Sequence, residues 1–150
     1  MRIWIDADAC PAPVKEIVIR AVKRLKIPAV FVANSALSLP VSEYLSTVRV
    51  GRGLDVADAH IAGQAQPGDM AVTQDIPLAA LLVRQGVVTI DIRGELYTAE
   101  TIDERLSVRD FMTGLREEGV ATGGPRPFGP QDRQRFAATF DAELSRLIAR

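Results

Sequence analysis

Apolar runs alternate with amphipathic segments along the first two thirds of the chain. Short stretches in which nearly every residue is apolar are typical of strands buried on both faces, whereas apolar residues at every third or fourth position indicate helices that cover a sheet. The expected strands are 2–6, 29–33, 48–50, 70–73 and 87–92, and the expected helices are 14–25, 41–45, 54–64 and a segment through 78–82. This alternation predicts an α/β fold with a mostly parallel, five-stranded sheet and helices on both faces.

The last third of the chain has a different pattern. A helix is expected near 100–118, with Thr101 and Glu104 as a capping box and with Val108, Phe111, Met112 and Leu115 buried. Residues 119–130 are rich in glycine and proline, and a closing helix follows whose apolar stripe is Phe136, Phe140, Leu144, Leu147 and Ile148. Because a lone terminal helix cannot form a domain, we expect it to pack on the sheet, so that residues 1–150 form one domain.

Composition narrows the function classes without naming one. The 150 residues carry 18 basic and 19 acidic side chains, a formal net charge of −1, which excludes a disordered chain and argues against a broad basic face for duplex DNA. One cysteine excludes an internal disulfide framework and fits a reducing cytosol. No apolar run approaches the roughly 20 residues of a membrane span. We therefore expect a cytoplasmic protein without a membrane segment, whose oligomeric state the sequence does not indicate.

Aspartates lie where expected strands end or helices begin. Asp6 and Asp8 follow the first strand, Asp75 follows the strand 70–73, and Asp55 and Asp58 lie three apart at a helix start. In an open parallel sheet, ligands bind beyond the carboxyl ends of the strands. Carboxylates that converge there repel one another unless a cation neutralises them, and hard oxygen ligands suit Mg²⁺ or Mn²⁺. The spacing therefore predicts a metal site at this edge.

Helix capping is the competing interpretation of these acids. Asp8, Asp75 and one of the pair Asp55 and Asp58 each stand where a side chain could accept hydrogen bonds from the first turn of a helix. Asp6 ends an apolar strand and has no obvious helix to cap, so capping explains it least well.

The motifs resemble those of the YaiI/YqxD family of uncharacterised bacterial proteins along the whole chain. The matching segments are Asp6-Ala7-Asp8-Ala9-Cys10-Pro11, 53–58, 68–69, Val72-Thr73-Gln74-Asp75-Ile76-Pro77-Leu78-Ala79, 93–97, 109–110, 122–125, 132–133 and 136–137. That family is similar in turn to PIN-like nucleases, whose strand-terminal Asp, D-A-x-I-A helix and T-x-D segment resemble Asp6, 58–62 and 73–75. The resemblance implies a PIN-like three-layer fold.

The same resemblance implies metal-assisted phosphodiester hydrolysis. Asp6, Asp58 and Asp75 would be the metal ligands, and Asp8 would be a further ligand or an acceptor for the nucleophilic water. PIN domains usually have one more acid after the second strand, where this chain offers only Glu43, so that Asp8 or Asp55 would take its place. Single-stranded RNA or DNA would be the substrate.

Arginine is the candidate for phosphate binding. Arginines outnumber lysines 15 to 3, and we assign phosphate contacts to Arg93 and Arg109 because both lie in matching motifs. Cys10 precedes a helix, where a thiolate is favoured, but the single histidine, His60, makes a Cys-His pair improbable. We interpret Cys10 as a small residue in a turn and His60 as a packing residue.

Two other functions fit parts of the pattern. The first is a non-catalytic nucleic-acid-binding or protein-binding domain that keeps the fold with a degraded metal site, which the near-neutral charge favours. The second is a haloacid-dehalogenase-like phosphatase with Asp6 as nucleophile and Asp8 as acid. That mechanism uses a lysine later in the chain, and none follows Lys26.

Overall fold

The chain folds into an α/β sandwich with a six-stranded sheet. The computed structural model describes residues 1–53, 56–122 and 126–149. Its elements in chain order are β1 (Ile3–Asp6), a 3₁₀ turn η1 (Ala7–Ala9), α1 (Ala12–Leu25), β2 (Ala29–Ala33), β3 (Leu45–Arg49), α2 (Val56–Gln64), β4 (Met70–Val72), α3 (Ile76–Arg84), β5 (Val88–Ile90), β6 (Leu96–Tyr97), α4 (Ala99–Glu117) and α5 (Pro130–Ala149). No helix among these residues is long and apolar enough to cross a membrane.

The sheet has the order β3-β2-β1-β4-β5-β6. Every neighbouring pair is parallel except β5 and β6, and the register sets Ile3 opposite both Ala29 and Met70. From β1 the chain first builds outward through β2 and β3, and it then returns to the other side of β1 with β4. The order of strands thus reverses between β1 and β4, and such a switch point is where open α/β sheets bind ligands.

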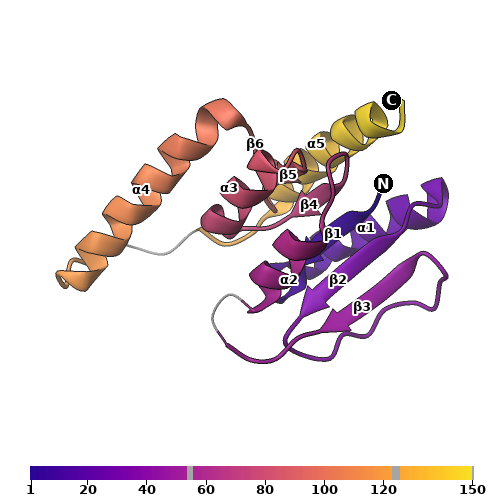
Figure 1. The fold of residues 1–150 in the computed structure, drawn as a ribbon, viewed down its shortest axis with the longest axis horizontal. Helices are drawn as coiled ribbons and strands as arrows, with labels where there is room; N and C mark the ends of the chain where they lie inside the picture. Colours follow the sequence, from indigo (N-terminus) through magenta and orange to yellow (C-terminus); the bar gives the residue numbers. More distant parts are fainter. Residues whose placement is uncertain (54–55, 123–125, 150) are drawn as a thin grey trace.

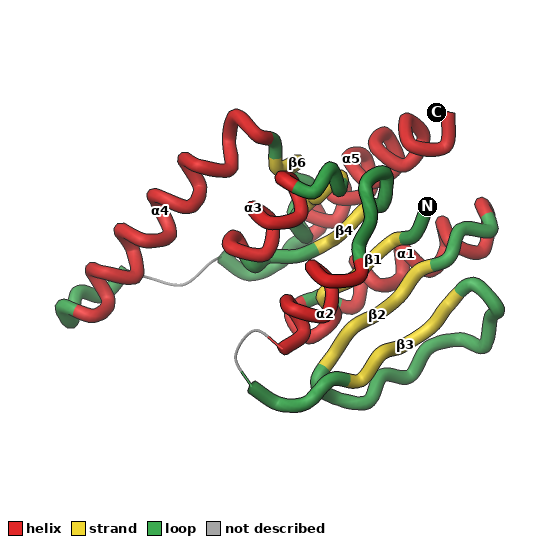
Figure 2. Tube along the Cα trace, in the orientation of Figure 1, coloured by secondary structure: helices red, strands yellow, loops and turns green. Residues whose placement is uncertain are grey.

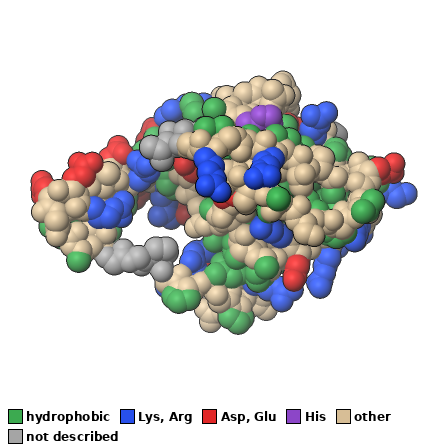
Figure 3. Space-filling model, turned by 90° about the horizontal axis from the view of Figure 1, so that it is seen from below, with side chains coloured by type: hydrophobic (Ala, Val, Ile, Leu, Met, Phe, Trp, Pro, Cys, Tyr) green, Lys and Arg blue, Asp and Glu red, His purple; other side chains and the backbone are tan. Residues whose placement is uncertain are grey.

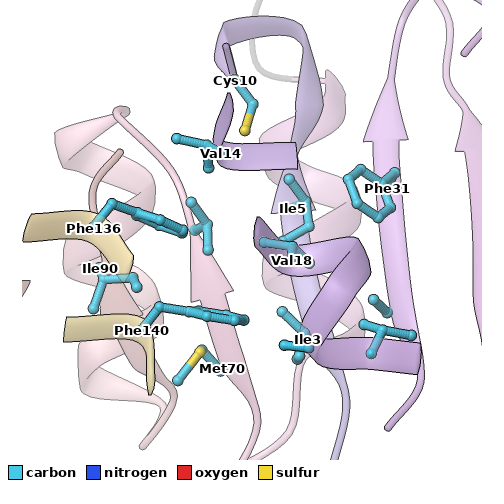
Figure 4. Close-up of a cluster of buried hydrophobic side chains, with 14 of the residues drawn as sticks. Ile3, Ile5, Cys10, Val14, Val18, Phe31, Met70, Ile90, Phe136 and Phe140 are labelled. Carbon is cyan, nitrogen blue, oxygen red and sulfur yellow. The ribbon is translucent and has the colours of Figure 1, made fainter. Parts of the chain in front are cut away.

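Two helical layers cover the sheet, as the apolar runs predict (Figure 1). Ile3 and Ile5 of β1 pack with α1 and with Phe136 and Phe140 of α5, and Figure 4 shows these side chains meeting between the layers. Trp4, between them, points to the opposite face, where it packs with α2 and α3. Both faces of the central strands are therefore buried, and the predicted three-layer fold is confirmed.

The outer strands differ from the expectation. The helix predicted at 41–45 is wrong, because these residues form a turn that leads into β3. Hydrogen bonding to β2 defines this strand, beginning with the Ala29 amide, which donates to the Tyr44 carbonyl at 2.8 Å. β3 is an edge strand with exposed positions, so it lacks the continuous apolar run of a buried strand. The sixth strand, β6, has only two residues, too few for a pattern to indicate.

α4 is less buried than its apolar residues suggest. It packs against α3 through Ile102 and Leu106 near its start, and its second half extends away from the sheet (Figure 2). The expected burial of Val108 and Phe111 is wrong, since their exposed fractions are 50% and 66%. The N-cap is Thr98, not Thr101, and its hydroxyl accepts from the Thr101 amide at 3.1 Å. Periodicity identified the helix but did not indicate that the apolar side chains of Val108 and Phe111 are exposed.

A buried carboxylate fastens α5 to the rest of the fold. Asp132 accepts hydrogen bonds at 2.7–2.8 Å from the guanidinium groups of Arg93, Arg126 and Arg135, and at 3.0 Å from the Gly129 amide. These donors, with Arg126 foremost, hold the pKa of Asp132 well below its usual range. The carboxylate thereby joins the turn after β5, the segment before α5 and the first turns of α5.

The turn after β5 packs directly on the backbone of α5. Gly94 has a φ of +87°, and a Cβ atom at this position would lie 2.5 Å from the Arg135 carbonyl oxygen. The Thr139 hydroxyl donates to the Gly94 carbonyl at 2.7 Å. Only glycine therefore allows both the turn and this close approach.

We expect Asp132→Asn to lower the urea midpoint of unfolding at pH 7, because three guanidinium groups lose their counter-charge. The folded-state pKa of Asp132 lies below the unfolded value of about 3.9, so its contribution is present above pH 4 and is lost as the pH falls further. The difference between wild type and variant should therefore shrink in acid.

The matched control is Asp141→Asn, because Asp141 forms an exposed ion pair with Arg24 at 3.5 Å. Exposed pairs contribute little, so this variant should unfold like the wild type. Equal midpoints for wild type and Asp132→Asn at pH 7 would contradict a stabilising role of the buried carboxylate.

Candidate functional site

Two of the predicted site acids meet at the switch point of the sheet. Asp6 is the last residue of β1, and Asp75 follows the end of β4 by three residues. β1 and β4 are parallel neighbours with Ile5 opposite Val72, so the chain leaves both strands at the same edge. The proximity of Asp6 and Asp75 follows directly from this topology.

The hydroxyl of Thr73 connects these two acids. Its Oγ1 donates to Oδ2 of Asp6 at 2.9 Å and accepts from the Asp75 amide at 3.0 Å, and the residue is buried. Oδ1 of Asp75 accepts from the Leu78 amide at 2.9 Å, which makes Asp75 the N-cap of α3. The capping interpretation of Asp75 is therefore confirmed, and the same residue also lies beside Asp6.

The environment of Asp6 disfavours its ionised form. Burial raises the pKa of Asp6, the hydrogen bond from Thr73 lowers it in part, and the nearby charges of Asp75 and Asp8 raise it again. A cation placed between these carboxylates would reverse the repulsion and would favour ionised Asp6.

Asp8 lies at the edge of the site and connects the turn after β1 to the residues after β2. It lies in η1, and its oxygens accept from the Asn34 amide at 2.8 Å and from the Ser35 hydroxyl at 3.3 Å, just after β2. It does not cap α1, whose N-cap is Pro11. Gln74 supports the same turn, since its Nε2 donates to the Ala9 carbonyl at 2.7 Å. The turn after β1 is thus fixed from both neighbouring strands.

A groove begins beside Asp75 and brings in two further predicted residues. Asp58, in the first turn of α2, and Arg109 of α4 line it together with Asp75. The groove has a volume of about 340 Å³. Its remaining walls come from α2 and α3 and are Ala59, Ala62, Pro77, Leu78 and Leu81. Asp58, Asp75 and Arg109, which are distant in sequence, therefore share one surface depression.

The predicted ligand set does not form a closed cluster. Among the residues that the structure describes, no three Asp, Glu, His or Cys side chains lie close enough to hold one ion. Asp55 lies outside the described residues. A closed set is not required for Mg²⁺, which usually keeps several waters and takes one or two carboxylates plus substrate phosphates. The pair Asp6 and Asp75 fits that mode of binding.

The predicted phosphate-binding residue Arg93 is held elsewhere, and Glu43 lies far from the site. The guanidinium of Arg93 is bound to Asp132 at 2.8 Å and to the Arg126 carbonyl at 2.6 Å, and it lies over the Phe128 ring. Arg93 does not line the groove. Glu43 precedes β3 and therefore lies at the amino edge of the parallel sheet, opposite the acids.

The surroundings of Cys10 and His60 indicate packing roles. Cys10 is buried, and burial raises the pKa of its thiol to about 12, which opposes thiolate chemistry. His60 packs edge-on against Trp4, with 6.3 Å between the ring centroids. Both positions agree with the turn and packing interpretations.

Thr73, Gln74 and Asn34 were not singled out as site residues from the sequence. The sequence Thr73-Gln74-Asp75 was the available signal for these contacts, because its three side chains bond to Asp6, to η1 and to α3. Asn34 contributes only a backbone amide, which no side-chain pattern reveals. Long-range partners of this kind are visible only once the strands are placed.

The comparisons with known proteins identify relatives along the whole chain. Residues 4–146 match the profile of a family described as an uncharacterised BCR, the YaiI/YqxD family. UPF0178 proteins of Myxococcus xanthus and Syntrophobacter fumaroxidans are 65% and 58% identical, and the alignments cover 99% and 97% of this chain and 97% and 95% of theirs. A UPF0178 protein of Geobacter metallireducens is 54% identical, over 99% of this chain and 96% of its own length. No solved structure matches.

We expect Asp6→Asn to stabilise the protein at pH 7. The folded-state pKa of Asp6 is raised above the unfolded value of about 3.9, so stability is lost as the pH rises from the unfolded pKa through the folded pKa. Asparagine carries no charge and still accepts from Thr73. Urea unfolding should show a higher midpoint at pH 7, and the advantage should vanish below about pH 4.

The control for this substitution is Asp103→Asn, since Asp103 is exposed on α4 and pairs with Arg84 at 3.4 Å. It should not reproduce the pH-dependent gain. An Asp6→Asn variant that is less stable than wild type at pH 7 would refute the unfavourable ionisation of Asp6.

We expect Thr73→Val to cost about 1–3 kcal/mol of unfolding free energy, because it leaves the Asp75 amide without its acceptor. The same change should raise the pKa of Asp6, which loses a hydrogen-bond donor. Denaturant unfolding and a carboxyl NMR titration measure the two effects. An unchanged pKa of Asp6 would show that Thr73 does not control its ionisation.

Proposed function

The chain belongs to the YaiI/YqxD family, and we propose that it is a divalent-cation-dependent phosphodiester hydrolase. The observation that carries this proposal is the pair Asp6 and Asp75, coupled through Thr73 at the switch point of the sheet. A partly buried carboxylate such as Asp6, whose pKa is raised by burial and by neighbouring acids, is typical of functional sites. The resemblance of the site motifs to those of PIN-like nucleases supports the same chemistry.

Carboxylate oxygens define the kind of cation. Asp6 and Asp75 would hold Mg²⁺ or Mn²⁺, with Asp58 and Asp8 as candidates for water-mediated contacts. When bound, such a cation polarises a phosphoryl oxygen and lowers the pKa of a water molecule. The residues of the chain would position the carboxylates and bind the substrate.

The surrounding residues position these groups. The α3 cap fixes the Asp75 carboxylate, and the Thr73 hydroxyl fixes that of Asp6. Arg109, across the groove, provides a positive charge for a substrate phosphate, to which a guanidinium binds in a bidentate manner. Because Arg93 is engaged by Asp132, the proposal relies on Arg109 rather than on Arg93.

A single strand of RNA or DNA is the proposed substrate. Proteins that bind duplex DNA neutralise many phosphates with basic side chains, whereas this chain has a net charge of −1. On the face seen in Figure 3, Lys and Arg side chains are interspersed with uncharged ones. A short segment of flexible strand at a groove needs fewer such contacts than a duplex.

A second candidate is a binding domain without turnover. The lack of a three-ligand group among the described residues favours it. Such a protein would bind the cation or a single strand through the same residues and would leave the phosphodiester intact.

The test is a cation-dependent hydrolysis assay. We expect wild type to cleave single-stranded RNA, single-stranded DNA or bis(p-nitrophenyl) phosphate with Mn²⁺ or Mg²⁺ and not with EDTA. Asp6→Asn and Asp75→Asn should each lower the rate by roughly 100-fold or more, since the cation supplies several kcal/mol of stabilisation. Asparagine remains a good N-cap, so Asp75→Asn keeps α3 intact.

Asp103→Asn is the surface control and should retain wild-type turnover. No cation-dependent turnover, or equal turnover in the Asp6 and Asp75 variants, would refute the hydrolase. Mn²⁺ binding measured by calorimetry, lost in Asp6→Asn but accompanied by no turnover, would establish the binding domain instead.

A further inference from the structure

The groove beside Asp75 has apolar walls, which the binding of a cation or a phosphate does not require. Five of its eight lining residues are apolar, and Leu81 among them is 49% exposed. An apolar surface next to carboxylates is costly to leave in water and favours contact with an uncharged group. The volume of about 340 Å³ lies at the small end of ligand pockets, which span roughly 300–1,000 Å³.

The groove is also lined by charged residues, which would contact the parts of a ligand that flank this uncharged group. Asp58 and Asp75 come from the starts of α2 and α3, whereas Arg109 comes from α4. The only ion pair of Arg109 among the described residues is with its exposed neighbour Asp110 at 3.7 Å, which is weak. Its guanidinium therefore remains available to an anion.

From these features we propose that the groove binds the nucleoside next to the scissile phosphate. The aliphatic walls would contact the base and sugar, the scissile phosphate would lie toward Asp75, and Arg109 would bind the phosphate on the other side of the same nucleoside. A nucleic acid has a phosphate on both sides of each nucleoside, whereas a lipid phosphodiester does not. The inference rests on the proposed hydrolase function and adds the place where the nucleoside of its substrate would bind.

Two chromogenic esters with the same leaving group test the apolar walls. Hydrolysis of thymidine 5′-(p-nitrophenyl phosphate) adds water across the P–O bond and releases p-nitrophenolate, thymidine 5′-phosphate and a proton. Methyl p-nitrophenyl phosphate reacts identically but offers no nucleoside. With Mn²⁺, we expect kcat/KM for the thymidine ester to exceed that for the methyl ester by about 10-fold or more.

Filling the groove should remove this preference. Ala59 is an exposed wall residue, so Ala59→Phe occupies the groove without disturbing the core. We expect its ratio of the two kcat/KM values to fall toward one. Gln64→Phe introduces the same side chain at an exposed position of α2 outside the groove and should keep the wild-type ratio.

A second substitution tests Arg109 independently of the walls. Wild type should prefer a thymidine 5′-ester that carries a 3′-phosphate over the same ester without one, by about 10-fold. Arg109→Gln should abolish this preference, and Arg116→Gln, an exposed position on α4 outside the groove, should keep it.

The outcomes separate the two levels of the proposal. Cation-dependent hydrolysis of both esters with a ratio near one in wild type would overturn the nucleoside groove and leave the hydrolase in place. An equal loss on both esters in Ala59→Phe would also overturn it. If no ester is hydrolysed with any cation, the hydrolase and the nucleoside groove both fail.

Discussion

The two hydrogen bonds of the Thr73 hydroxyl connect the two strands at the centre of the sheet. They connect the end of β1 with the loop after β4, which are the two strands between which the order of the sheet reverses. The loop leads at once into α3 through the Asp75 cap, so a single buried hydroxyl fixes the position of a strand end, a helix start and two carboxylates. Such a hydroxyl is satisfied as donor and as acceptor, which explains why it is tolerated in a buried position.

The carboxylate of Asp6, in contrast, is not fully compensated by its neighbours. Its carboxylate is partly buried, receives a hydrogen bond from one side chain, and faces two like charges, so the fold gains nothing by ionising it. Asp132 is more deeply buried but accepts from five donors, and its ionised form stabilises the fold. The two carboxylates therefore differ in their electrostatic environment, because Asp132 is surrounded by guanidinium groups whereas the neighbours that raise the pKa of Asp6 are acidic.

Most of the fold was predictable because its signals are local. β2 begins and ends where the apolar run 29–33 does, and Asp6 and Asp75 meet because parallel strands end at a common edge. The errors concern non-local partners. β3 is defined by pairing with β2, Phe111 lies exposed on the outer half of α4, and Arg93 is bound by an aspartate 39 positions away. Periodicity records which side of an element is apolar and contains no information about what covers it.

The two ends of the groove differ in how firmly the fold supports them. The acidic end is built on the sheet, since Asp75 caps α3 and is bonded through Thr73 to the strand ends. Arg109 belongs to α4, which packs mainly on α3 through Ile102 and Leu106, both on the N-terminal side of Arg109. A displacement of α4 would therefore change the width of the groove and the position of its guanidinium while the carboxylates stayed in place. In the proposed function, cation binding and recognition of the rest of the substrate would thus depend on separate elements of the structure.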